Sequence, residues 1–264
     1  MKKWIKIVFW TLFTVGVFVI MSMTKTEQEE YLMEKPAILI EASGENAFLT
    51  KDELYTRLVR EGLLFPGQKF KELDLRKIEQ NISKMSEVLA TKAYTNIGGT
   101  WNIDVKIRKP IARIYNKFGE NYYLDELGFV MVPSYLYTAR VVIVTGNIPD
   151  RISSPSVNEI MNNDTLKTIQ NLDEIYRISK YVCNDPFLNS QIGQIHLLKN
   201  GDFVLIPQVG GQTIVFGSAK TDEEVADKFE KLLIFYQQGL PFEGWEKYEE
   251  INLKYKKQIV CKKK

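Results

Sequence analysis

The sequence predicts an α+β protein with three parts: a single N-terminal transmembrane helix, a small strand–helix–helix–strand–strand domain, and a larger mixed domain built on an antiparallel sheet with helices. Three observations support this. Residues 7–23 carry no charge, the apolar period changes from 3.6 to 2 near residue 88, and strand and turn patterns recur after residue 109. A chain of 264 residues with 45% hydrophobic and 26% charged content is foldable, which excludes disordered and fibrous classes.

The small net charge of +2 is unevenly distributed. Lys2, Lys3 and Lys6 give the first 23 residues a charge of +3, whereas the rest of the chain holds 32 basic and 33 acidic residues. This balance excludes a dedicated nucleic-acid binder, so no nucleic-acid partner is expected.

The uncharged stretch predicts a membrane span. From Trp4 onward, about 20 residues in a helix cover about 30 Å, the thickness of a bilayer core. A cleaved signal peptide is the alternative, but this stretch exceeds the usual apolar region and lacks a small-x-small cleavage site, which favours an uncleaved anchor. Because the lysines precede the span, the positive-inside rule keeps the short N-terminus in the cytoplasm. We therefore expect a cytoplasmic tail (1–6), an anchor in membrane lipid (7–23), a juxtamembrane spacer (24–37) and an exported remainder.

The first exported domain is expected at residues 38–108. Ala37–Glu41 is a strand candidate, and Thr50 with Glu53 forms a capping box that begins a helix. A second helix begins near Asp74, with apolar residues at spacings of three and four. The strict alternation of residues 101–108 then predicts a strand that pairs with residues 88–95 through the Gly98-Gly99 turn and its flanks.

The second domain is expected at residues 109–264. Its elements follow from apolar period, caps and turn residues. They are an Asp125–Gly128 turn between two strands, a helical stretch at Ser156–Val182, strands at Ile192–Leu198, Asp202–Pro207 and Val209–Gly217, and a helix capped by Thr221.

The order of elements in 38–108 resembles a POTRA domain, and four later segments resemble motifs of the bacterial division family FtsQ/DivIB. These are the junction Arg108–Ala112, the hairpin Tyr122–Val130, the strand end Val144–Gly146 and the last strand Ile251–Tyr255. Gln191–Ile195 and Gly244-Trp245 look like the Bacteroidetes form of FtsQ. Asn252 and Lys254 depart from the Asp and Arg of the family's last strand.

The resemblance implies a divisome scaffold in the bacterial inner membrane. Such a protein crosses the membrane once, keeps its C-terminal domains in the periplasm, and works at the division septum. It would recruit and link division proteins, above all the coiled-coil partners FtsB and FtsL, and so regulate septal peptidoglycan synthesis. The alternative from another class is a membrane-tethered periplasmic enzyme or envelope-biogenesis factor, in which the POTRA-like unit positions a substrate.

No residue pattern predicts catalysis, a cofactor or a metal site. His196 lies inside an alternating strand, which favours a structural role, and Gly210, Gly211 and Gly217 lack the lysine of a phosphate loop. Cys183 and Cys261 are 78 residues apart, so they form either a disulfide in an exported compartment or two separate thiols.

Six lysines lie in the last eleven residues. They are explained by a solubilising tail that protects a sheet edge, by an edge strand kept for one partner, or, with less support, by contact with anionic lipid or nucleic acid. In the second interpretation a partner strand adds to the C-terminal edge, as the family resemblance implies. The candidate partner contacts are Lys254, Tyr255, Lys256, Gln258 and Ile259.

Overall fold

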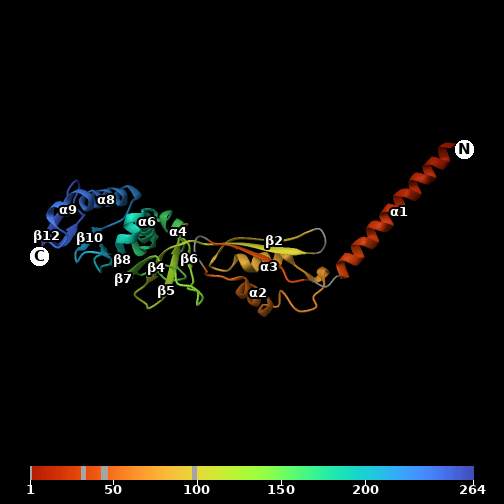
Figure 1. The fold of residues 1–264 in the computed structure, drawn as a ribbon, viewed down its shortest axis with the longest axis horizontal. Coiled ribbons are helices and arrows are strands. Elements are labelled where there is room, and N and C mark those ends of the chain that lie inside the picture. The colour runs from red at the N-terminus through yellow and green to blue at the C-terminus, as the bar shows by residue number, and fades with distance from the viewer. Residues whose placement is uncertain (1, 31–33, 43–46, 97–99) are drawn as a thin grey trace. The chain divides into compact units, whose positions relative to one another are not determined.

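The computed structural model describes residues 2–30, 34–42, 47–96 and 100–264, with the side chains at 2, 3, 5 and 21–30 outside the description. The chain divides into two compact units (Figure 1). The first holds residues 1–42 and 49–107, and the second holds 43–48 and 108–264. The division after Ile107 falls one residue before the expected boundary.

The N-terminal segment forms one helix, α1 (Lys2–Glu30), which extends beyond both ends of the expected span. Part of the expected spacer is therefore helical, and residues 31–33 lie outside the described chain. Lys6 is exposed, as are the apolar side chains of Trp4, Ile7, Phe9, Trp10 and Phe18. Within the described residues, no helix combines the length and the apolar character needed to cross a membrane. The transmembrane anchor stays a prediction.

The two helices of the first unit begin where their caps predict. In α2 (Lys51–Arg60), the Thr50 side chain accepts a hydrogen bond from the Glu53 N–H, and in α3 (Leu75–Ser83) Asp74 accepts from the Lys77 N–H. A short 3₁₀ turn, Phe70–Glu72, lies between them. Because an N-cap satisfies an otherwise unpaired donor, it fixes where each helix starts.

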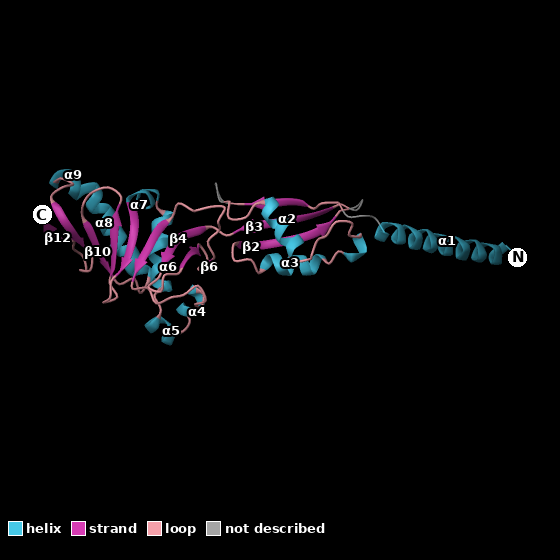
Figure 2. Cartoon of the chain, turned by 90° about the horizontal axis from the view of Figure 1, so that it is seen from below, coloured by secondary structure: helices cyan, strands magenta, loops and turns pink. Residues whose placement is uncertain are grey.

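The sheet of the first unit has the order β1-β3-β2, with β1 (Ala37–Glu41) parallel and β2 (Val88–Thr95) antiparallel to β3 (Trp101–Ile107). The expected alternation is confirmed, since Trp101, Ile103, Val105 and Ile107 are buried. The Gly98-Gly99 turn lies outside the described residues. The helices α2 and α3 accompany this sheet in Figure 2, and α3 packs on β2.

The second unit contains a nine-stranded sheet in the order β12-β11-β10-β9-β8-β7-β4-β5-β6. Its strands are β4 (Pro110–Tyr115), β5 (Asn121–Asp125), β6 (Val130–Met131), β7 (Val142–Gly146), β8 (Ile192–Leu197), β9 (Phe203–Pro207), β10 (Thr213–Gly217), β11 (Tyr248–Asn252) and β12 (Val260–Lys263).

The expectation of an antiparallel sheet is wrong at three neighbouring pairs. β4 pairs with β7, β7 with β8, and β10 with β11 in parallel. Parallel neighbours need a crossover connection. Helices lie within two of these connections, between β7 and β8 and between β10 and β11.

Those crossover helices cover the buried face of the sheet. The first connection holds α4 (Val157–Met161), α5 (Asp164–Ile169), α6 (Leu172–Asn184) and α7 (Pro186–Gln191), and the second holds α8 (Asp222–Ile234), a π-helix (Phe235–Gly239) and α9 (Leu240–Glu243). The expected helical stretch at 156–182 is thus interrupted, because Asn163 caps a new helix at Asp164 and Leu172 starts another. Residues of α6 and α8 form the core with the sheet (Figure 2).

Two buried carboxylates hold the loops of this unit. Asp125 accepts hydrogen bonds from the Leu127 and Phe129 N–H groups and pairs with Arg108 at 2.8 Å, which confirms the predicted turn. Asp150 is fully buried and accepts from the N–H groups of Asn171 and Leu172 at the start of α6. Burial raises the pKa of Asp150, and nearby Asp173 adds to this, while the two N–H groups oppose it.

Candidate functional site

The outermost strand at one edge of the large sheet is β12, which pairs with β11 on one side only, with Ile251 opposite Cys261. Just beyond the strand, the Lys264 N–H donates to the Lys247 C=O at 3.1 Å. Backbone groups in a strand alternate in direction, so Cys261 and Lys263 turn their N–H and C=O groups to the open side. Within the described chain, no strand occupies that side.

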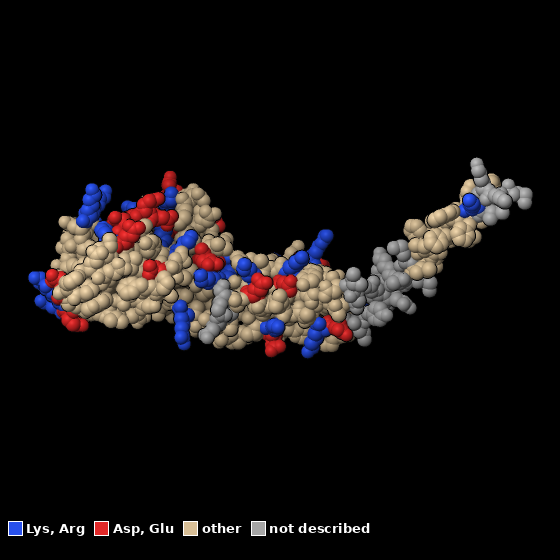
Figure 3. Space-filling view, turned by 45° about the horizontal axis from the view of Figure 1, so that its top comes forward, with Lys and Arg blue, Asp and Glu red and all other residues tan. Residues whose placement is uncertain are grey.

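The side chains of β12 and its flanks combine lysines with contacts to the core from Ile259 and Cys261. Lys262 pairs with Glu249 at 3.1 Å and Lys264 with Glu246 at 2.9 Å, so residues on or near β11 neutralise two edge lysines. Cys261 is half-buried against the core, and burial raises the pKa of its thiol. Basic and acidic side chains lie beside one another at the C-terminal end in Figure 3.

Residues 253–259 form a loop between β11 and β12, so the last strand that the family resemblance placed at Ile251–Tyr255 ends at Asn252. Leu253 is fully buried, and its N–H donates a hydrogen bond to the Val215 C=O. The Asn252 side chain accepts from the Lys254 N–H at 3.1 Å, a local turn that ends β11. Tyr255 follows in the loop and is 49% exposed. An alternating pattern does not reveal this competing hydrogen bond.

The five predicted partner contacts all lie in that loop. They are next to the edge strand β12 but outside the residues that pair between β11 and β12. Lys254 pairs with Asp202 at 2.7 Å, which raises the pKa of Lys254. The Tyr255 C=O accepts a hydrogen bond from Lys231 of α8 at 3.0 Å, so α8 holds the loop in place. Lys256 and Gln258 are exposed, and Ile259, partly buried against the core, directly precedes β12. The structure thus brings the predicted residues together beside β12.

A groove that the sequence did not reveal runs between this loop and α8. One hollow of about 490 Å³ lies between α8 and residues 253–257, and another of about 340 Å³ lies between the end of α8, the π-helix and residues 257–259. Lys231 and Lys257 line both hollows, which we therefore call together the α8 groove. The signal in the sequence was faint: Lys228, Lys231 and Ile234 recur every three residues along the helix.

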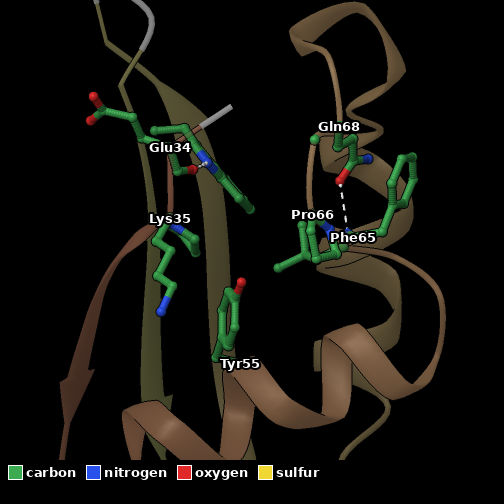
Figure 4. Close-up of a pocket in the computed structure, with 10 residues that line it drawn as sticks. Glu34, Lys35, Tyr55, Phe65, Pro66 and Gln68 are labelled. Carbon is green, nitrogen blue, oxygen red and sulfur yellow. Dashed lines mark hydrogen bonds between the residues drawn. The ribbon is translucent and has the colours of Figure 1, made fainter. Parts of the chain in front are cut away.

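The first unit has a hollow of its own, of about 240 Å³. Figure 4 shows Lys35 and Tyr55 on one side of it and Phe65, Pro66 and Gln68 on the other. The Gln68 side chain accepts from the Phe65 N–H and so shapes the loop, while the Lys35 ammonium lies 5.3 Å from the centre of the Tyr55 ring. None of the predicted site residues lies here.

The three residues considered for chemistry, His196, Cys183 and Cys261, lie on elements of the second unit. His196 lies in β8, where its Nδ1 is 2.8 Å from the Thr145 hydroxyl, which also accepts from Gln194. Cys183 on α6 and Cys261 on β12 are free thiols. Within the described residues, no group of three or more His, Cys, Asp or Glu side chains could hold a metal ion.

The chain thus combines a small unit built on a three-stranded sheet with a larger unit built on a nine-stranded mixed sheet, in which β12 and β6 are the edge strands. Comparison with family models places it further. Residues 34–106 match the POTRA-like domain, and residues 109–262 match the model described as FtsQ/DivIB, C-terminal related. The chain belongs to the FtsQ/DivIB family. No curated protein matches it.

Membership of the FtsQ/DivIB family supports three general conclusions about the role of the protein. The family domains indicate a role in cell division. The family is one of non-enzymatic division scaffolds, and it acts through protein–protein interactions in the divisome.

Proposed function

We propose that this protein is a single-pass divisome scaffold that recruits and links division proteins at the septum by accepting a partner strand at β12. The observation that carries the proposal is the open edge of the nine-stranded sheet, where Cys261 and Lys263 present backbone groups to the open side. An edge strand can extend its sheet with a segment of another protein, and backbone hydrogen bonds then supply much of the affinity.

The proposed partners are the coiled-coil proteins FtsB and FtsL, which the family resemblance implies. An FtsB-like segment would add to β12, and the loop 253–259 would select it through side-chain contacts. Through these partners the scaffold would regulate septal peptidoglycan synthesis.

The proposed location is the inner membrane, with the N-terminus in the cytoplasm and both units in the periplasm. Support comes from the lysines that precede the uncharged stretch and from the exposed apolar side chains of α1. A fluorescent fusion to the N-terminus should gather at midcell in dividing cells. An even signal around the envelope would contradict the septal role.

The edge itself is tested by three proline variants of the full chain in detergent. Cys261→Pro and Lys263→Pro each remove an outward N–H, whereas Lys264→Pro removes the N–H that bonds to Lys247 within the sheet. Co-purification of a small single-pass coiled-coil protein should be lost in the first two and kept in the third. Circular dichroism of each variant shows whether it is folded. If folded Cys261→Pro and Lys263→Pro proteins still retain the partner, β12 is not the docking edge.

A further inference from the structure

The α8 groove carries unbalanced positive charge at one end. Its larger hollow is lined by five lysines and two acids, namely Lys228, Lys231, Lys254, Lys256, Lys257, Glu224 and Asp227. Lys228 pairs with Glu224 at 2.5 Å, and Lys231 pairs with Asp227 at 3.0 Å. Hydrogen bonds from Lys228 and Ser218 outweigh the effect of burial and lower the pKa of Glu224. Glu224 and Asp227 thus each form an ion pair with a lysine of α8 itself.

The surplus charge lies at the tip of the loop. Lys254 is paired with Asp202, whereas Lys256 and Lys257 make no ion pair within the described residues, and both are exposed. Lys257 has a φ of 59°, and among the described residues no other non-glycine residue has a positive φ. Such a backbone conformation is strained for a residue with a side chain, and strained positions are concentrated at functional sites.

The other end of the groove is apolar and reaches the sheet edge. Ile234 is 54% exposed there, beside Phe235 and Ile259. The π-helix forms its wall, and Gly239 is required because a Cβ at that position would lie 2.6 Å from the Phe235 ring. Single π-turns are frequent at functional sites. Ile259 precedes Val260, so this end adjoins the start of β12.

We infer that the α8 groove binds the continuation of the partner strand, as an extended segment with a bulky apolar residue over Ile234 followed by acidic residues against Lys256 and Lys257. This rests on the proposed strand addition at β12. The partner segment would meet three surfaces in turn: its strand pairs with β12, its apolar residue enters the hollow at Ile234, and its acidic residues reach Lys256 and Lys257. From Glu224 to Gly239 the groove is about 22 Å long at 1.5 Å per helical residue, which an extended segment of about seven residues covers.

The test measures binding of synthetic peptides to the full chain in detergent by fluorescence anisotropy. Each labelled peptide has about eleven residues: a Thr-Val-Thr-Val strand, one Leu, and a tail of Asp and Glu spaced by Ser. It is made in both chain directions. Companion peptides carry Lys in place of the acids, or Gly in place of Leu.

The acidic peptide in one direction should bind about tenfold more tightly than its lysine companion, because two exposed ion pairs contribute about this much. The double variant Lys256→Glu and Lys257→Gly should abolish that difference, whereas Lys199→Glu, in an exposed turn elsewhere, should keep it. Ile234→Asp should weaken the Leu peptide to the level of the Gly peptide. Ile169→Asp, at a site that is 58% exposed on α5, is its matched control.

Two other results separate this inference from the proposed function. If Cys261→Pro abolishes binding while the groove variants behave as their controls, the groove assignment is wrong and strand addition stands. If folded Cys261→Pro leaves binding unchanged, strand addition itself is wrong. Equal binding of acidic and lysine peptides, or binding of neither, overturns the groove assignment.

Discussion

Asp150 provides a sharp test of how the second unit is held together. This fully buried residue precedes the crossover helices, and its two carboxylate oxygens accept the N–H groups of Asn171 and Leu172 at 3.0 and 3.2 Å. The cap residue of α6, Asn171, makes no side-chain cap of its own. Asp150 therefore caps α6 from a distant loop, and we consider the variants Asp150→Ala and Asp150→Asn.

The expected losses differ in size. Alanine leaves two helix N–H groups without an acceptor, and each unpaired buried donor costs about 1–3 kcal/mol. Loss of an N-cap acceptor costs about 0.5–2 kcal/mol. We expect Asp150→Ala to lower the free energy of unfolding by about 2–4 kcal/mol. Asparagine keeps an acceptor oxygen, so its loss should be about 1 kcal/mol near neutral pH.

The pH dependence has a defined sign. Burial raises the pKa of Asp150 in the folded state, so the folded state binds the proton more tightly than the unfolded state. This contribution to stability is full below the ordinary carboxyl pKa of about 3.9 and is lost as the pH rises through the folded value. The stability advantage of the wild type over Asp150→Asn should therefore shrink as the pH rises above about 4.

Urea unfolding followed by the fluorescence of Trp245, which lies in the second unit, measures both quantities. Trp4, Trp10 and Trp101, which lie in the first unit, are replaced by Phe in every variant, so that Trp245 alone reports on the second unit. Equal losses for the two variants, or a difference that does not vary with pH, would refute the assignment of Asp150 as a remote cap.

Three further predictions concern buried or paired groups in the two units. Arg177→Met leaves the buried Asp173 carboxylate without its 2.8 Å partner, and urea unfolding should show a loss of about 3–5 kcal/mol; a loss below 1 kcal/mol would contradict it. Glu79→Ala removes the acceptor that lies 2.6 Å from the Ala93 N–H at the outer side of β2, so it should cost about 1 kcal/mol, and Glu79→Gln should restore most of it. Cys183 and Cys261 are free thiols, so mass spectrometry should show that both react with a maleimide in the unfolded chain without prior reduction. Labelling that occurs only after reduction would contradict this and indicate a disulfide.

The sequence predicted those elements whose cause is local. Thr50 and Asp74 begin their helices through their own side chains, and the alternation from Trp101 places every second residue in the core. The turn at Asp125 likewise depends on hydrogen bonds within four residues. The parallel pairs of the large sheet depend on crossovers between distant segments, which no local pattern contains. For the same reason the α8 groove was missed, because a helix and a loop about 25 residues apart form its walls.

Solubility and partner docking were both possible explanations of the C-terminal lysines. In the structure, these lysines lie on two surfaces, the edge strand β12 with its flank and the loop 253–259. Lys262 and Lys264 pair with Glu249 and Glu246, so on the edge strand and just beyond it they are largely neutralised and suit protection against indiscriminate pairing. Lys256 and Lys257 remain uncompensated at the loop tip, where exposed charge can select a partner and accelerate its approach. A partner that pairs with β12 therefore meets Lys262 and Lys264 already paired, and within the described residues it meets unpaired lysines at Lys263 and at the loop tip beside the strand. Raising the ionic strength should then slow association more than it speeds dissociation, and an unchanged association rate in Lys256→Glu would contradict this division.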